Sequence, residues 1–144
     1  MHRILLAVDG SEHSDRAVAY LIGLIRDGGL LGGKTEVHLV HVRPHLAERF
    51  SRTMSAEELD RYYQEGSDSA CRTAIEMLQN EGVEFIRHTR IGAPAEIIVS
   101  SAKTLHCDSI VMGTHGAGFM TGMLLGSVAS KVIHLTEMPV TLVK

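Results

Sequence analysis

The chain has 144 residues, of which 44% are hydrophobic and 22% are charged, and its formal net charge at pH 7 is −3. This length and composition indicate one globular domain, placed over residues 1–144, that is large enough to bury a core. The negative charge and an aromatic content of 4% argue against a nucleic-acid partner and an anionic membrane surface, and no apolar run approaches the roughly 20 residues of a membrane span.

The two cysteines, Cys71 and Cys107, bear on the compartment. With no recognisable signal peptide, they fit a reducing cytoplasm better than a disulfide scaffold. Cys71 falls within a helical pattern and Cys107 falls just before a strand, so both are expected as small buried residues. We therefore expect a cytoplasmic protein.

Strand-like and helix-like patterns alternate along the first half of the chain. Residues 2–9 form an apolar run rich in Ile, Leu and Val, which is typical of a strand buried on both faces. Apolar residues then recur at helical spacing and end at Asp27-Gly28-Gly29. A second strand is predicted over about 35–43, followed by a loop over 44–54 that Pro44 begins.

The alternation continues in the second half. Ser55 and Glu58 form a capping box that starts a long helix, in which Gly66 is a local weak point. The remaining elements are predicted, in order, as a strand from Val83, a helix from Pro94, a strand over 109–112, a helix over 128–135 and a strand over 140–143.

Five strands that alternate with four helices predict a single-domain, doubly wound α/β fold of the Rossmann-like kind. Right-handed crossovers then make a five-stranded parallel sheet with helices on both faces. In such sheets, ligands bind beyond the carboxyl ends of the strands, where the strand order reverses.

The most informative motif is Gly113-Thr114-His115-Gly116, which is followed nine residues later by Gly126-Ser127. Glycines at a strand exit let backbone N–H groups approach an anion, and a helix N-terminus adds positive partial charge. The motif therefore predicts a phosphate-binding loop. It does not match the P-loop pattern, and the first strand, which ends Val8-Asp9-Gly10-Ser11, lacks the GxGxxG dinucleotide fingerprint.

The spacing Gly-x2-Gly-x9-Gly-Ser after the fourth strand resembles the nucleotide motif of the universal stress protein family. Four other segments resemble landmarks of that family in the same order along essentially the whole chain: residues 3–11, 39–42, 92–98 and 138–143. The resemblance implies the strand order 3-2-1-4-5, which the residues alone leave open. That order places the switch point between the strands that end at Asp9 and Gly113.

The resemblance also implies a site for an adenine nucleotide, with apolar positions around the adenine and Asp9 on the ribose side. The predicted nucleotide-binding residues are Ala7, Val8, Asp9, Val42, Met112, Gly113, His115, Gly116, Gly126, Ser127 and Val128. Plainer alternatives are turn glycines, a helix cap at Ser127, a strand-end turn at Asp9 and ordinary sheet core.

The kind of nucleotide stays open at this point: ATP, ADP, AMP or a cyclic nucleotide. No Lys or Arg occurs between Lys103 and Lys131, whereas ATP-binding members of the family often carry a basic residue in the spacer. A triphosphate would depend on backbone amides, the helix dipole, Mg²⁺ and either Arg49 or Arg52 reaching over from the loop. Asp9 is the one acid clearly placed near the site, so we expect no efficient hydrolysis and name no catalytic residue.

The histidines do not predict a metal site. His38 and His41 are close in the sequence, but they point to opposite faces of a strand. No cysteine or carboxylate completes a tetrahedral ligand set with them.

The leading hypothesis is an adenine-nucleotide-binding stress-response or regulatory module with an unidentified protein partner, dimeric through its fifth strand. Two alternatives remain: a slow ATPase that uses the same site, and a protein-interaction module whose glycine loop is only structural. A phosphoacceptor receiver domain is excluded because the third strand ends Thr89-Arg90-Ile91-Gly92, without an Asp.

Overall fold

The computed structural model describes residues 1–28, 33–116, 122 and 124–144. The elements follow one another as β1 (His2–Ala7), α1 (Glu12–Arg26), β2 (Thr35–Arg43), α2 (Glu48–Ser51), α3 (Ala56–Asn80), β3 (Phe85–Ile91), α4 (Pro94–Thr104), β4 (Ser109–Gly113), α5 (Ser127–Leu135) and β5 (Val140–Val143). Apart from α2, this is the order of elements that the sequence predicts.

The strands form one parallel sheet in the order β3-β2-β1-β4-β5. This confirms the predicted fold class and strand order. β1 is central, and its Leu6 lies between Leu39 of β2 and Val111 of β4. Because the order reverses between β1 and β4, the carboxyl ends of these two strands frame the switch point.

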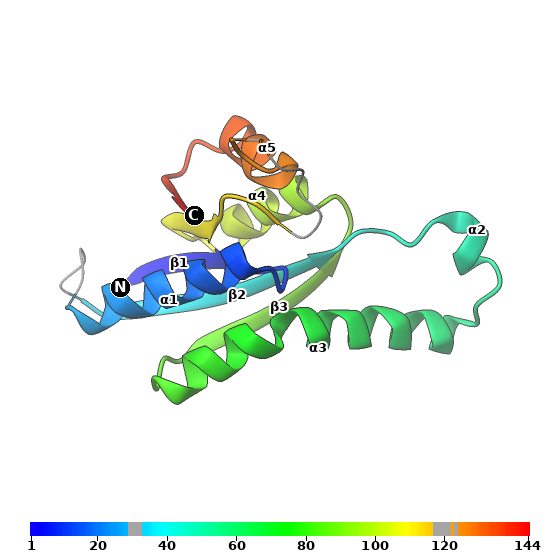
Figure 1. The fold of residues 1–144 in the computed structure, drawn as a ribbon, viewed down its shortest axis with the longest axis horizontal. Helices are drawn as coiled ribbons and strands as arrows, with labels where there is room; N and C mark the ends of the chain where they lie inside the picture. Colours follow the sequence, from blue (N-terminus) through cyan, green and yellow to red (C-terminus); the bar gives the residue numbers. More distant parts are fainter. Residues whose placement is uncertain (29–32, 117–121, 123) are drawn as a thin grey trace.

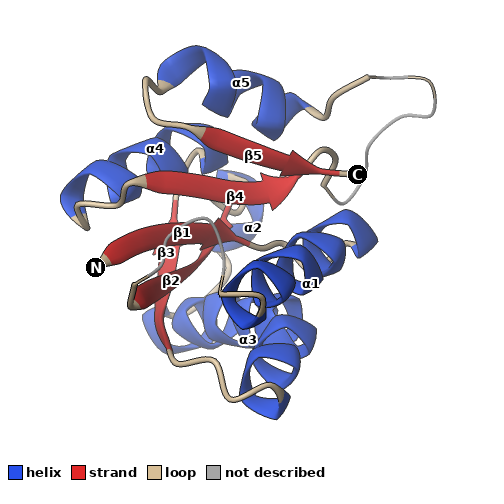
Figure 2. Ribbon diagram, turned by 90° about the vertical axis from the view of Figure 1, so that its left-hand side faces the viewer, coloured by secondary structure: helices blue, strands red, loops and turns tan. Residues whose placement is uncertain are grey.

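Helices cover both faces of the sheet (Figure 2). α1 and α3 pack against a first core that includes Ile4 and Leu6 of β1, and α4 and α5 pack against a second core that includes Leu5 and Ala7. Successive side chains of a strand point to opposite faces. A strand between two cores must therefore be apolar at every position, which explains the continuous apolar run at the start of the chain.

Part of the helical layer extends beyond the sheet, as Figure 1 shows for α2 and the start of α3. α2 occupies four residues of 44–54, so the prediction of a loop is wrong there; a single helical turn is too short for a periodic signal. The capping box of Ser55 and Glu58 is present at the start of α3. Within the described ranges, no helix is both long and apolar enough to cross a membrane.

Both cysteine side chains are buried, as the sequence predicts. Burial raises the pKa of the Cys71 thiol, and it raises the pKa of the Cys107 thiol to about 11. At neutral pH the two thiols are therefore protonated and act as small apolar groups.

Candidate functional site

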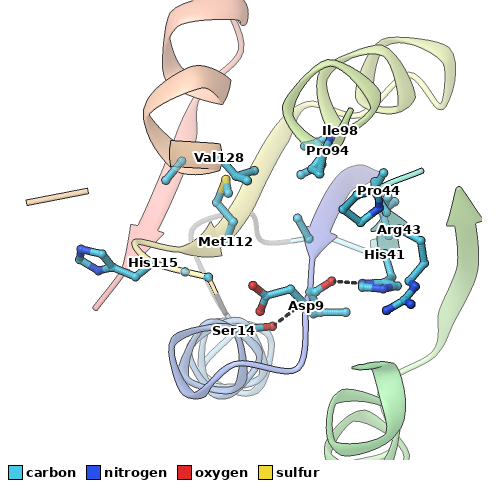
Figure 3. A pocket seen from close by; sticks show the side chains of 17 residues that line it. Asp9, Ser14, His41, Arg43, Pro44, Pro94, Ile98, Met112, His115 and Val128 are labelled. Carbon is cyan, nitrogen blue, oxygen red and sulfur yellow. Dashed lines mark hydrogen bonds between the residues drawn. The ribbon is translucent and has the colours of Figure 1, made fainter. Parts of the chain in front are cut away.

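A cavity of about 280 Å³ opens at the carboxyl ends of β1, β2 and β4, where the strand order reverses (Figure 3). Most of the residues predicted to bind a nucleotide line it: Ala7, Val8, Asp9, Val42, Met112, Gly113, His115, Gly116 and Val128. Gly126 and Ser127 are not among the lining residues, although they immediately precede Val128. The fold thus gathers the ends of β1, β2 and β4 and the start of α5 around one cavity.

Asp9 is held at the exit of β1 by the first turn of α1. Its backbone N–H donates to Ser14 Oγ at 3.2 Å, and its Oδ1 accepts from the Ser11 N–H at 2.9 Å. Ser11 is also the N-cap of α1, because its Oγ accepts from the Ser14 N–H. These local hydrogen bonds fix the strand exit and direct Asp9 Oδ2 toward Gly116.

Gly116 leaves the space that the Asp9 carboxylate occupies. A Cβ added at Gly116 would collide with Asp9 Oδ2. Any side chain at this position must therefore displace the carboxylate. The glycine that the sequence assigns to a phosphate loop is also what lets the loop and Asp9 face each other across the cavity.

Gly113 has a packing role. A Cβ added there would lie 2.8 Å from the carbonyl carbon of His13 and 2.9 Å from the Cβ of that residue. These atoms belong to α1 or are fixed to its backbone, so they cannot yield without a shift of the helix. Gly113 lines the cavity, but its missing side chain is required for the close approach of α1 to β4.

The N-terminus of α5 borders the cavity. Gly126 is its N-cap, with no side-chain cap hydrogen bond, and the helix begins at Ser127. The alternative in which Ser127 caps the helix is therefore wrong, and Ser127 lies exposed in the first turn. The Gly126 N–H donates to the carbonyl oxygen of Thr114 at 2.8 Å, which ties the helix start to the end of β4. A first turn without a side-chain cap presents its N–H groups to an anion.

His41 lines the cavity but is not among the residues predicted from the sequence. It is 5% exposed, and its Nδ1 lies 2.7 Å from the carbonyl oxygen of Val8. A carbonyl oxygen only accepts, so Nδ1 carries the proton. Burial, helped by the charges of Arg43 and Arg87, lowers the pKa of His41, so the ring is neutral at pH 7. Its Nε2 is buried and has no hydrogen-bond partner among the described residues.

Arg43 is a second lining residue that sequence reasoning missed. Its guanidinium lies 5.1 Å from the centre of the Tyr62 ring and against Gly66 of α3, where a Cβ would come within 2.5 Å of Arg43 Cζ. The glycine that weakens α3 thus makes room for this cation. The other lining residues that the sequence did not predict are Ser14, Val40, Pro44, Pro94, Ile98 and Ala129.

Arg49 and Arg52, the arginines proposed to reach over the phosphates, do not line the cavity. Arg52 Nη2 donates to Glu48 Oε1 at 2.7 Å, and the Arg49 guanidinium lies 4.7 Å from the centre of the Phe50 ring. Both are therefore engaged within or beside α2. That expectation is wrong for this structure.

No group of three or more metal-ligating side chains is found in the part of the chain that the structure describes. His38 instead lies between His88 and Glu36, with 3.0 Å from His38 Nδ1 to His88 Nε2 and 3.0 Å from His38 Nε2 to Glu36 Oε1. His38 belongs to the face of β2 that α4 covers, opposite to that of His41, as strand alternation predicts.

The fold and the cavity define a doubly wound α/β domain with an anion-binding loop at its switch point. The model of the universal stress protein family matches residues 1–144, and the chain belongs to that family. The chain is 31% identical over 145 residues to a universal stress protein of Thermus aquaticus, covering 98% of this chain and 97% of the relative. The solved structure of the hypothetical protein MJ0577 superposes with a TM-score of 0.78 at 27% identity, covering 99% of this chain and 95% of that one.

Three more distant solved structures share the fold and are described with a nucleotide bound. They are a universal stress protein in complex with cAMP (TM-score 0.68, 23% identity), one from Archaeoglobus fulgidus in complex with dAMP (0.70, 23%) and one from Arabidopsis thaliana with AMP bound (0.66, 16%). They cover 99–100% of this chain and 92–98% of their own.

Proposed function

We propose that this protein is an adenine-nucleotide-binding regulatory module whose site is the cavity at the switch point. The observation that carries the proposal is the meeting of Asp9, Gly116 and the N-terminus of α5 around one cavity. A carboxylate that accepts from ribose hydroxyls and backbone N–H groups that bind phosphate are the two polar ends that a nucleotide needs.

The remaining wall of the cavity suits a purine base. Val42 and Met112 from the sheet and Pro94 and Ile98 from α4 provide apolar surface on one side of the cavity (Figure 3). Asp9 lies on the other side in this view. Ligand pockets are typically apolar with a few placed polar groups, and this arrangement follows that rule.

The nucleotide-bound relatives support this proposal, because AMP, dAMP and cAMP share the adenine base and one phosphate group. The sequence motif points the same way, since the loop from Gly113 to Gly116 and the Gly126-Ser127 pair have the spacing of the family's nucleotide motif. With a di- or triphosphate, Mg²⁺ would be held between the phosphates and Asp9, a hard oxygen ligand.

We do not propose rapid ATP hydrolysis. Asp9 is the one carboxylate among the described residues that line the cavity, and Arg43 is directed toward α3. Phosphoryl transfer needs charge that stabilises the transferring group and a residue that orients water. A slow ATPase activity at this site remains the secondary hypothesis, to be measured as phosphate release.

Two features of the assembly and the compartment belong to the same proposal. β5 is an edge strand with half-buried side chains, and such an edge pairs readily with another strand. We therefore propose a homodimer through β5, with a protein partner that responds to the bound nucleotide. The buried, protonated thiols of Cys71 and Cys107 fit a reducing cytoplasm.

Mass spectrometry of the ligand released from freshly purified, undialysed protein tests the proposal directly. Thermal melts with ATP, ADP, AMP and cyclic AMP, with and without Mg²⁺, provide the second measurement. A ligand that binds only the native state adds about 2.7 kcal/mol at about 100 times its dissociation constant. Flat melts with every nucleotide, together with no heat of binding in calorimetry, would reject the site and favour a nucleotide-independent interaction module.

A further inference from the structure

The glycine-loop end of the cavity is poor in positive charge. The sequence has no Lys or Arg between Lys103 and Lys131, a stretch that spans β4, the glycine loop and the start of α5. Residues 117–121 and 123 of the spacer lie outside the described residues, but their sequence adds no cation. Lys131 itself is paired with Glu96 of α4, and this pairing lowers the pKa of Glu96.

The remaining cations near the site are committed elsewhere. Among the described lining residues, Arg43 is the one permanent cation, and its guanidinium lies against Tyr62 and Gly66 of α3. Figure 3 shows Arg43 and His115 on opposite sides of the cavity, with Asp9 between them. Lys144 follows β5 at the same edge of the sheet, but it is exposed and does not line the cavity.

Negative charge, by contrast, gathers beside the glycine loop. Asp9 lines the cavity, and Glu12 and Asp15 lie in the first turn of α1, which begins directly behind it. Burial raises the pKa of Asp15, and the charges of Asp9 and Glu12 raise it further, so the three carboxylates repel one another. Arg16 pairs with Glu12 and leaves the other two carboxylates uncompensated by that guanidinium.

The cavity is also small. Its volume of about 280 Å³ lies just below the range of roughly 300–1,000 Å³ that is typical of ligand pockets. Backbone N–H groups and a helix N-terminus suffice for one phosphate. Each further phosphate adds negative charge to a region that already holds carboxylates and offers no paired cation.

We infer that the site selects adenine nucleotides with a single phosphate group, AMP or cyclic AMP, over ADP and ATP. This inference rests on the function proposed above and adds the class of nucleotide to it. The selectivity is electrostatic: the extra phosphates of ATP bring about three more negative charges toward the Asp9, Glu12 and Asp15 carboxylates. It follows that salt, which screens this repulsion, should narrow the difference between AMP and ATP.

Calorimetric titration of the full chain with AMP, cyclic AMP, ADP and ATP measures the selectivity. The titrations are done with and without Mg²⁺, at about 50 mM and about 500 mM salt. We expect AMP to bind at least about tenfold more tightly than ATP at low salt, with a smaller ratio at high salt. ATP or Mg²⁺–ATP binding as tightly as AMP overturns the selectivity but leaves the nucleotide site intact. Absence of binding by all four nucleotides overturns both proposals.

A charge-removing variant tests the cause. Glu12→Gln combined with Asp15→Asn removes two carboxylates that do not line the cavity, so AMP affinity should stay unchanged while ATP affinity rises about threefold. The matched control is Glu76→Gln, an exposed position in the second half of α3, at the opposite end of the sheet (Figure 1). Circular dichroism verifies that each variant is folded. An unchanged AMP-to-ATP ratio in the double variant would refute the electrostatic cause, as would an equal change in the control.

Discussion

The side chain of His41 holds the end of β1 in place through Val8, whose carbonyl oxygen lies 2.7 Å from His41 Nδ1. Val8 immediately precedes Asp9, so the hydrogen bond from β2 sets the position of the backbone that carries the pocket carboxylate. Both residues are buried. A buried carbonyl group that loses its donor costs about 1–3 kcal/mol.

We therefore expect His41→Leu to affect both stability and binding. The free energy of unfolding should fall by about 1–3 kcal/mol, and AMP should bind about fivefold more weakly because Asp9 is less well fixed. His41→Asn keeps an N–H donor at the position of Nδ1 and should restore most of the affinity. Calorimetric titration and urea unfolding of the three proteins measure both effects. Equal binding losses in the two variants would mean that His41 does not act through the Val8 carbonyl.

The lowered pKa values of His41 and His88, for which burial is the largest cause, predict a dependence of stability on pH. The unfolded chain titrates its histidines near pH 6.5, above their folded values. Between these values the unfolded state binds more protons, so stability is fully present above about pH 6.5 and falls as the pH drops below it. Urea unfolding at about pH 7.5 and about pH 5.5 measures the loss. His41→Asn should reduce it, and an equal loss in that variant would assign the effect to other groups.

Gly116→Ala should weaken nucleotide binding at least about tenfold, because the new Cβ collides with Asp9 Oδ2 and must displace the carboxylate. Gly116→Val, with a larger branched side chain, should abolish binding. The matched control is Gly23→Ala in α1, where a Cβ meets no heavy atom within 4 Å. This control should leave binding unchanged and stabilise the fold by about 0.5–1 kcal/mol. A folded Gly116→Val variant with normal affinity for AMP would contradict the assigned role of Gly116.

Gly113→Ala should behave differently from the substitutions at Gly116. Its Cβ would meet the backbone of His13 at 2.8 Å, so α1 must shift away from β4. We expect a loss of about 1–3 kcal/mol of unfolding free energy, as for other overpacked sites. Thermal melts without a ligand measure it. A wild-type melting temperature in Gly113→Ala would show that the helix adjusts at no cost.

The proposed dimer is tested at Val140. The Ile110 N–H donates to the Pro139 carbonyl and the Thr114 N–H to the Val143 carbonyl, so in a parallel ladder the Val140 N–H points to the free edge of β5. Val140→Pro removes that donor and should prevent edge pairing, whereas Val140→Ala keeps it. Leu142→Lys is a poorer test, because Leu142 packs against the second core. Sedimentation analysis at micromolar concentration gives the state of each protein, and a monomeric wild type contradicts the dimer.

Much of the fold was predictable because its signals are local. The apolar run of β1 and the capping box at Ser55 report on a strand between two cores and on a helix start, whatever the rest of the chain does. Asp9 and Gly116 were predictable for a related reason, since a strand exit and a glycine spacing are both visible in the sequence. Strand order was different: it came from the resemblance to a family, since parallel strands with similar crossovers fit more than one order.

The sequence by itself determined the kinds of element, their order and the residues at the strand exits. Only the tertiary structure decided what those residues contact across the fold. It paired His41 with Val8, placed Arg43 over Gly66 instead of near the glycine loop, and gave Gly113 a packing role against α1. These contacts join residues that are between 23 and 100 positions apart, such as Arg43 with Gly66 and His13 with Gly113. Local periodicity carries no information on such distances, because they are set by how the helices pack on the two faces of the sheet.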